Sequence, residues 1–153
     1  MSELRVGKKA PDFSLVGNDG KKHSLKEFLG KKLILYFYPK DDTSGCTKEA
    51  CSFRDNLSSI KKKDAVVVGV SPDAISAHEK FISKFDLNFL LLSDESKDML
   101  QAYGIWKEKS MYGRKYMGVE RTTLIIDEKG KIVYIFSKVK VDGHTEEVLK
   151  ALS

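Results

Sequence analysis

The sequence predicts an α/β protein with a mixed central β-sheet, helices on both of its faces and an N-terminal β-hairpin. Three observations support this fold class. Apolar runs without polar alternation, typical of strands buried on both faces of a sheet, alternate along the chain with helical patterns. Turn signals near the N-terminus separate two short strands. A second pair of strands, joined by a tight turn, precedes a closing helix.

The elements of the first half follow from turn signals and apolar runs. Gly-Asn-Asp-Gly at residues 17–20 separates two strand-like segments, Ser24 is placed to cap the helix that follows, and Pro39 ends a long apolar run. In order, the expected elements are a hairpin over 12–25, a short helix over 25–29, a buried strand over 32–38 and a helix over 45–60.

The second half continues the alternation. Ser-Pro-Asp at residues 71–73 starts a helix, Gly104 ends another, and Asp-Glu-Lys-Gly at 127–130 forms the turn of an antiparallel hairpin. Residues 105–119 have no clean period and contain two glycines, so we expect a long exposed loop there. In order, the expected elements are a strand over 65–70, a helix ending at 85, a strand over 89–92, a helix through 99–103, strands over 120–126 and 131–136, and a helix over 144–152. This order is a thioredoxin-like architecture.

The composition is that of one compact domain over residues 1–153, with 41% hydrophobic and 32% charged residues. The longest strongly apolar run, at 33–38, is far shorter than the ~20 residues of a membrane-spanning helix. The N-terminus has no continuous apolar signal region, so the expected location is the cytoplasm. The net charge of +5 comes from lysine clusters at expected turns and helix ends, which predict a solvated surface and no nucleic-acid site.

The two cysteines, Cys46 and Cys51, lie on the helix expected over 45–60. At about 100° per residue, Cys46 shares the core-facing stripe with Ala50 and Phe53, whereas Cys51 points about 140° away from Cys46. An intact helix places their Cα atoms about 8.6 Å apart, beyond the ~7 Å that a disulfide tolerates. A bridge between them therefore requires the first helical turn to unwind.

Cys46 follows the end of a buried strand and lies in the first turn of its helix, with Thr43 or Ser44 as the N-cap. There the unpaired N–H groups and the helix dipole favour a thiolate, so Cys46 is predicted to be a reactive sulfur. The alternative is two buried small hydrophobic residues. No histidine stands at ligand spacing from a cysteine, so no metal and no cofactor are expected.

Several motifs resemble those of the peroxiredoxins. The pattern Pro39-x-x-x-Thr43-x-x-Cys46 matches their P-x-x-x-T-x-x-C motif, and Gly-Cys-Thr-Lys-Glu-Ala-Cys at 45–51 is similar to the bacterioferritin comigratory protein, or peroxiredoxin Q, branch. The resemblance covers essentially the whole chain, through further segments at residues 7–13, 69–73, 89–94, 103–104 and 120–123.

The resemblance implies a peroxidase of antioxidant defence that reduces hydrogen peroxide and organic hydroperoxides to water and alcohols. It makes Cys46 the peroxidatic nucleophile and Cys51 the resolving thiol. The sulfenic acid of Cys46 would be trapped by Cys51 as an intramolecular disulfide, which thioredoxin or a similar dithiol protein reduces. The expected partners are thus a peroxide and a dithiol, with no nucleic acid and no membrane, and the chain is expected to be a monomer, a weak dimer being the alternative.

Four further residues receive roles from the resemblance. Thr43 would hydrogen-bond the thiolate and the peroxide, and Pro39 would shield the pocket from water. Arg121 would approach from the neighbouring strand to hold both charges, and Glu49 would orient that arginine. The alternatives are a surface strand residue at 121 and an ordinary exposed helix residue at 49.

Formation of the thiolate alone would explain little of the reactivity of Cys46 toward peroxide. Lowering the pKa of a thiol from about 8.5 to about 6 raises the thiolate fraction at neutral pH roughly 30-fold, but intrinsic nucleophilicity falls on the order of 10-fold. Donors aimed at the departing oxygen must therefore supply most of the rate. The candidates are Thr43, Arg121 and the backbone N–H of Cys46.

Two other functions remain open at this point. A general thiol–disulfide oxidoreductase is disfavoured by the four residues between the cysteines, because such enzymes use a C-x-x-C pair at a helix start. A redox sensor would use the same oxidation of Cys46 to switch a partner surface by helix unwinding. Peroxide turnover with excess reductant separates the three, because a sensor reacts once and a general oxidoreductase reduces insulin disulfides.

Overall fold

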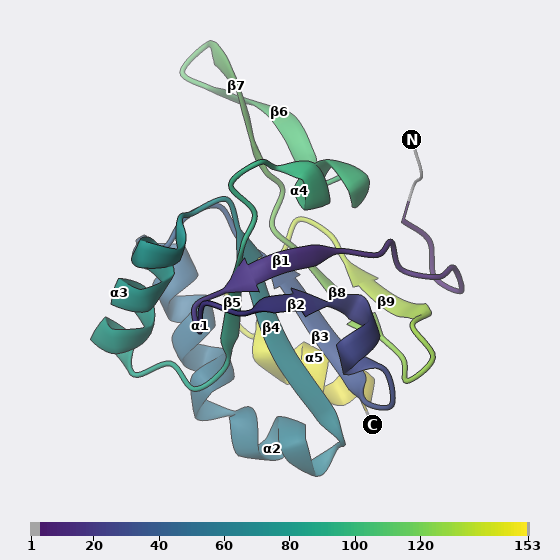
Figure 1. The fold of residues 1–153 in the computed structure, drawn as a ribbon. Helices are drawn as coiled ribbons and strands as arrows, with labels where there is room; N and C mark the ends of the chain where they lie inside the picture. The colour runs from purple at the N-terminus through teal and green to yellow at the C-terminus, as the bar shows by residue number, and fades with distance from the viewer. Residues whose placement is uncertain (1–3, 153) are drawn as a thin grey trace.

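The computed structural model describes residues 4–152 of the chain (Figure 1). The strands in that range are β1 (Ser14–Gly17), β2 (Lys22–Ser24), β3 (Lys32–Phe37), β4 (Ala65–Ser71), β5 (Leu90–Ser93), β6 (Trp106–Met111), β7 (Arg114–Val119), β8 (Thr122–Ile126) and β9 (Ile132–Phe136). The helices are α1 (Ser44–Asp55), α2 (Leu57–Lys62), α3 (Ile75–Phe85), α4 (Asp98–Ala102), α5 (His144–Leu152) and the single 3-10 turn η1 (Leu25–Phe28).

Among the described residues, seven strands form one sheet in the order β2-β1-β5-β4-β3-β8-β9. The central strands β3, β4 and β5 run parallel. The strands toward both edges pair antiparallel, β1 and β2 on one side and β8 and β9 on the other. The mixed sheet and the N-terminal hairpin that the sequence predicted are both confirmed.

The sheet is buried on both faces because β3 sends alternate side chains to opposite sides. Its odd-numbered residues pack with α4, η1 and the N-terminal segment. Its even-numbered residues pack with α1, α2, α3 and α5, which lie together on the other side of the sheet (Figure 1). Each large apolar side chain buried in this way contributes about 1.5–3 kcal/mol, which is why strands without polar alternation mark the centre of the fold.

The segment predicted as a loop over 105–119 is instead a β-hairpin, β6-β7, that projects from the body of the molecule in Figure 1. Its turn consists of Tyr112 and Gly113, with φ of 51° and 76°. Such turns usually carry Asn-Gly or Asp-Gly, so a turn that begins with tyrosine is not recognised from the sequence. Most of its side chains are exposed on both faces, so no buried face imposes alternation on the sequence.

The segment predicted as one helix over 45–60 forms two helices, because the helix is interrupted at Asn56. The Asn56 side chain donates to the carbonyl oxygen of Ser52 at 2.8 Å, a local bond that competes with helix continuation. Leu57 and Ile60 remain buried, so the apolar stripe continues across the break. No helix in the described range 4–152 is long and apolar enough to cross a membrane.

Candidate functional site

The candidate site lies where β3 ends and α1 begins. Strand β3 ends at Phe37. The loop over 39–43 follows, and Thr43 is the N-cap of α1. Strand β8 pairs antiparallel with β3, so that Thr122 lies opposite Phe37. The antiparallel register therefore brings the residue before β8 to the same edge of the sheet as the first turn of α1.

That residue is Arg121, and it contacts Cys46 directly. Arg121 Nη2 donates to Cys46 Sγ at 3.2 Å. The arginine backbone is held in place by the Val139 N–H, which donates to its carbonyl oxygen at 3.0 Å. The guanidinium lies against Gly45, where a Cβ would be in van der Waals contact with Nη2 at 3.4 Å. A positive charge and an N–H donor therefore both face the sulfur.

Glu49 completes this group from one turn further along α1. Arg121 Nη1 donates to Glu49 Oε1 at 2.6 Å, so the planar guanidinium bridges the carboxylate and the sulfur. Glu49 is only 1% exposed, which contradicts the alternative of an ordinary exposed helix residue. The structure thus brings together three of the six site residues that the sequence singled out: Cys46, Glu49 and Arg121.

Burial makes Glu49 a weaker acid than an exposed glutamate. Desolvation raises its pKa from 4.5 to about 7, although the charge and hydrogen bond of Arg121 lower it. Among the described residues, the buried side-chain atoms without a hydrogen-bond partner are Glu49 Oε2 and the Tyr36 hydroxyl. The carboxyl group of Glu49 therefore titrates near neutral pH, one helical turn from Cys46.

The other three site residues are placed as follows. Thr43 occupies the N-cap position, but its hydroxyl donates to the carbonyl oxygen of Lys40 at 2.9 Å and makes no capping bond. Because its one hydrogen is donated to Lys40, the hydroxyl keeps only its acceptor lone pairs for a further partner. Pro39 is half-buried and follows directly on the last buried residue of the β3 segment.

Cys51 lies on a different face of α1 from Cys46. Cys46 is 1% exposed and packs in the core cluster with Ala50 and Phe53, whereas Cys51 is half-buried and both thiols are free. This confirms the predicted division of the two cysteines between the core-facing stripe and another face. The helix between them is intact, so the geometric barrier to a disulfide applies.

A second cluster beside the site was missed in the sequence. Oxygen and nitrogen atoms of Asp41, Asp73 and His78 lie within 4.8 Å of one another. These residues are far apart in the chain, and no spacing between the histidine and a cysteine or carboxylate marks them. Asp41 and Asp73 follow parallel strands β3 and β4, and residues that follow parallel strands meet at one sheet edge, which is the signal that would have indicated the cluster.

Comparison with known proteins gives consistent matches. The chain matches the AhpC/TSA family over residues 6–135. It is 51% identical to a putative peroxiredoxin bcp of Coxiella burnetii, over 97% of this chain and 99% of that protein, and 46% identical to peroxiredoxin Bcp of Bacillus subtilis, over 97% and 95%. A solved structure of the Xanthomonas campestris bacterioferritin comigratory protein, described for its alkyl peroxide reduction activity, superimposes with a TM-score of 0.90 at 37% identity, covering 97% of this chain and 95% of that one. These matches confirm the predicted thioredoxin-like fold.

Proposed function

This chain belongs to the AhpC/TSA family and is a thiol-dependent peroxidase, and from that premise we propose that Cys46 is its peroxidatic nucleophile and Cys51 its resolving thiol. The observation that carries the assignment is the 3.2 Å contact between Arg121 Nη2 and Cys46 Sγ at the start of α1. Cys51 lacks these features, because it lies one turn deeper in the helix and on another face. Its position suits a thiol that reacts second.

In the first step the Cys46 thiolate attacks the terminal oxygen of a hydroperoxide. The S–O bond forms as the O–O bond breaks, and the alkoxide that leaves takes up a proton, which yields the alcohol and Cys46 sulfenic acid. For hydrogen peroxide the leaving group becomes water. Cys51 then attacks the sulfenic sulfur, which releases water and leaves the disulfide. A dithiol protein of the thioredoxin type returns both thiols and leaves as its own disulfide.

Arg121 stabilises the transition state of the first step. Negative charge moves from the sulfur to the departing oxygen, and a planar guanidinium that already contacts the sulfur can donate to both atoms. Glu49 holds the plane of that guanidinium through Nη1 at 2.6 Å. Hydrogen bonds that strengthen as charge develops raise the rate more than those that bind the ground state.

The disulfide step requires residues 43–53 of α1 to unwind, because the two Cα atoms are about 8.6 Å apart in the intact helix. Polar and aromatic contacts tie this stretch to α5 and to the loop before it. Lys48 pairs with Asp142 of that loop on the exposed surface, and the Ser52 hydroxyl shares a hydrogen bond with Thr145 Oγ1 of α5 at 2.6 Å. Buried Phe53 packs edge-on against His144 of α5. Beyond the stretch, Arg54 Nη1 donates to the Phe85 carbonyl oxygen at 2.5 Å, which holds the end of the helix. Unwinding of this stretch takes most of α1 and leaves α2, with its buried Leu57 and Ile60, packed on the sheet, which is less costly than loss of both helices.

Substitution of each cysteine tests the assignment in an assay that couples peroxide consumption to NADPH through thioredoxin and its reductase. Cys46→Ser is expected to abolish turnover. Cys51→Ser is expected to keep one stoichiometric oxidation of Cys46 and to lose recycling by thioredoxin, with partial rescue by a small thiol. Full thioredoxin-supported turnover in Cys46→Ser would overturn the assignment, and a single turnover by the unsubstituted protein would favour a sensor.

We further propose that the chain works as a single-domain monomer in the cytoplasm, with thioredoxin as the reductant. Two free thiols that form only a transient disulfide suit a compartment in which dithiol proteins keep cysteines reduced. Sedimentation of the reduced and oxidised protein tests the oligomeric state. A dimer that persists on dilution to about micromolar concentration has a free energy of association of about −8 kcal/mol or stronger, and it would contradict the monomer.

A further inference from the structure

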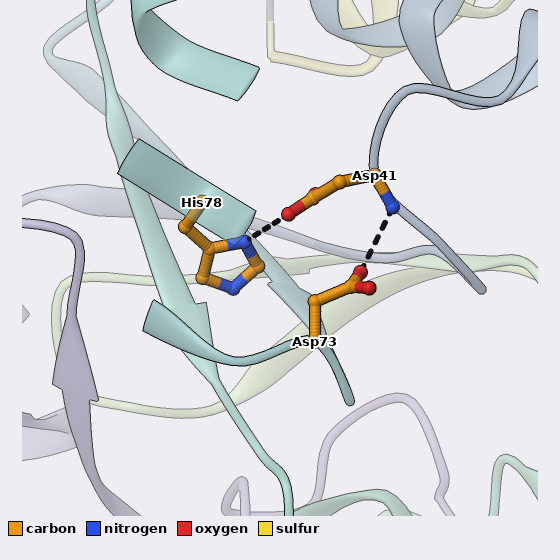
Figure 2. Close-up of side chains that lie close together, drawn as sticks. All are labelled: Asp41, Asp73 and His78. Carbon is orange, nitrogen blue, oxygen red and sulfur yellow. Dashed lines mark hydrogen bonds and ion pairs between the residues drawn. The ribbon is translucent and has the colours of Figure 1, made fainter. Parts of the chain in front are cut away.

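His78 is a fully buried histidine of α3 that stands close to the candidate site. Both of its ring nitrogens face oxygen atoms. Nε2 lies 2.8 Å from the carbonyl oxygen of Leu92, and Nδ1 lies 2.6 Å from Asp41 Oδ2, the contact drawn in Figure 2. A carbonyl oxygen only accepts hydrogen bonds, so Nε2 carries a hydrogen. A neutral ring would then present a bare Nδ1 lone pair to the carboxylate.

The short contact therefore requires one more proton, shared between His78 Nδ1 and Asp41 Oδ2. Imidazole is a stronger base than carboxylate, which favours an imidazolium paired with an ionised Asp41. The carboxylate is stabilised from its other side, where the Tyr38 hydroxyl donates to Oδ1 at 2.6 Å. Burial lowers the pKa of His78, but the hydrogen bond and charge of Asp41, the Leu92 carbonyl and the charge of Asp73 raise it above 6.5 overall.

The same cluster fixes the backbone of the loop over 39–43. The Asp41 N–H donates to Asp73 Oδ2 at 2.8 Å (Figure 2), and the Ser71 hydroxyl donates to the same oxygen at 2.7 Å. Asp41 is thus held through its backbone and through both carboxylate oxygens. The next residue, Asp42, has a φ of 58°, a left-handed conformation that aspartate adopts more readily than most residues.

We propose that the protonated pair of His78 and Asp41 positions the peroxide-reactive thiolate, by fixing the loop over 39–43 and with it the N-cap of α1 that carries Cys46. His78 touches neither the sulfur nor the peroxide and acts through the loop, so it is a positioning residue. This inference rests on the proposed role of Cys46. It adds a requirement for a buried hydrogen-bonded pair that lies outside the group of Cys46, Glu49 and Arg121.

A proton, and not a metal ion, is the occupant that the contacts support. The atoms of Asp41, Asp73 and His78 are close enough to ligate a cation, but His78 Nδ1, both oxygens of Asp41 and Asp73 Oδ2 already have hydrogen-bond partners. The groups that face His78 are Asp41 from the loop, Tyr38 from the end of the β3 segment, Asp73 from the loop after β4 and the Leu92 carbonyl of β5. Both charged members of this set are acidic, and they favour the imidazolium.

The protonation state can be observed directly in the unsubstituted, reduced protein. Nitrogen-15 NMR of the imidazole is expected to show both His78 nitrogens protonated at pH values above the ordinary histidine pKa of about 6.5. A neutral His78 with a single protonated nitrogen at pH 7 would overturn the proton assignment. This measurement depends neither on Cys46 chemistry nor on the folding of any variant.

Two substitutions separate the partners of His78. His78→Asn places its amide nitrogen near the position of Nδ1 and can still donate to Asp41 Oδ2, whereas His78→Gln reaches toward the Leu92 carbonyl and removes the donor to Asp41 Oδ2. We expect His78→Gln to slow single-turnover oxidation of Cys46 by peroxide about 10–100-fold, the loss typical of a small misplacement of a reacting atom. His78→Asn should recover most of that loss. His23→Gln is the matched control, because His23 also contacts carboxylates through both ring nitrogens, but on the N-terminal hairpin.

Alkylation of Cys46 supplies the readout that a merely structural role would not produce. If the loop is released in His78→Gln, a bulky alkylating reagent should reach Cys46 faster while peroxide reacts more slowly. Asp41→Asn should behave in the same way and serves if His78→Gln does not fold. Peroxide and alkylation rates within about 2-fold of the His23→Gln control, less than 0.5 kcal/mol, would overturn the positioning role. The proposed function would survive that result as long as Cys46→Ser remains inactive.

Discussion

Replacement of Arg121 by lysine separates charge from geometry at the candidate site. The guanidinium reaches two groups at once, Cys46 Sγ at 3.2 Å through Nη2 and Glu49 Oε1 at 2.6 Å through Nη1. A lysine keeps the positive charge but carries a single nitrogen on a flexible stem. It can approach the sulfur or the carboxylate, but it cannot bridge them in one plane. The substitution therefore keeps most of the electrostatic support for a thiolate and removes the oriented donor.

The size of the effect follows from which step uses that donor. Removal of one preorganised donor from a site where charge develops in the transition state lowers rates about 10²–10³-fold, or about 2.7–4 kcal/mol. The thiolate population can account for only a few-fold of this, because a retained charge at a similar distance stabilises the anion to a similar degree. We therefore expect the second-order rate with peroxide to fall at least about 10²-fold in Arg121→Lys.

Two measurements on the same variant distinguish these contributions. Stopped-flow mixing with peroxide gives the rate of Cys46 oxidation, and the absorbance of the thiolate at short ultraviolet wavelength, followed across pH, gives its population. Cys51→Ser serves as the background, so that only one thiol reacts. A rate loss that is fully explained by a smaller thiolate population would refute the role of Arg121 in the transition state.

Three further outcomes follow from the same contacts. Burial raises the pKa of Glu49 from 4.5 to about 7, so the folded state loses stability as pH rises between these values, by as much as about 3 kcal/mol; urea unfolding at several pH values should show this slope, and Glu49→Gln should flatten it. The pKa of His78 is raised above 6.5, so its contribution is complete below that pH and is lost as pH rises through the folded value; an unchanged stability profile in His78→Asn would contradict this. Amide hydrogen exchange should show that residues 43–53 lose protection when the disulfide forms, and equal protection in both states would mean that the reduced helix is already open.

The centre of the fold could be predicted because its strands are buried on both faces. The apolar runs that predicted β3, β4 and β5 contain few polar residues, and burial of both faces leaves no room for any other pattern. The hairpin β6-β7 could not be recognised for the opposite reason. It packs against no second layer along most of its length, and its turn places Tyr112 where glycine or asparagine is usual.

The site could be predicted only in part from the residues themselves. The position of Cys46 at a helix start is a local property, and helical periodicity placed it correctly on the buried stripe. Its contact with Arg121 depends on the antiparallel register of β8 against β3, which the sequence does not specify locally, so the resemblance to a family supplied that residue. The pair of Asp41 and His78 depends on a contact across 37 positions of chain, and neither periodicity nor spacing indicates it.

The site has to be rigid when peroxide reacts and loose when the disulfide forms, and the chemistry itself can bring about the change. A thiolate and the guanidinium of Arg121 attract each other as opposite charges, whereas a neutral sulfenic acid offers the same donor only a hydrogen-bond acceptor. Oxidation therefore weakens the contact that holds the first turn of α1 and raises the population of the unwound segment. Asp41 keeps its bonds upstream of the turn, and Arg54 keeps its bond to the Phe85 carbonyl oxygen beyond it, so the loosening is confined to the segment between them. Cys46 can then move toward Cys51 while the sheet edge that positioned it for peroxide stays in place.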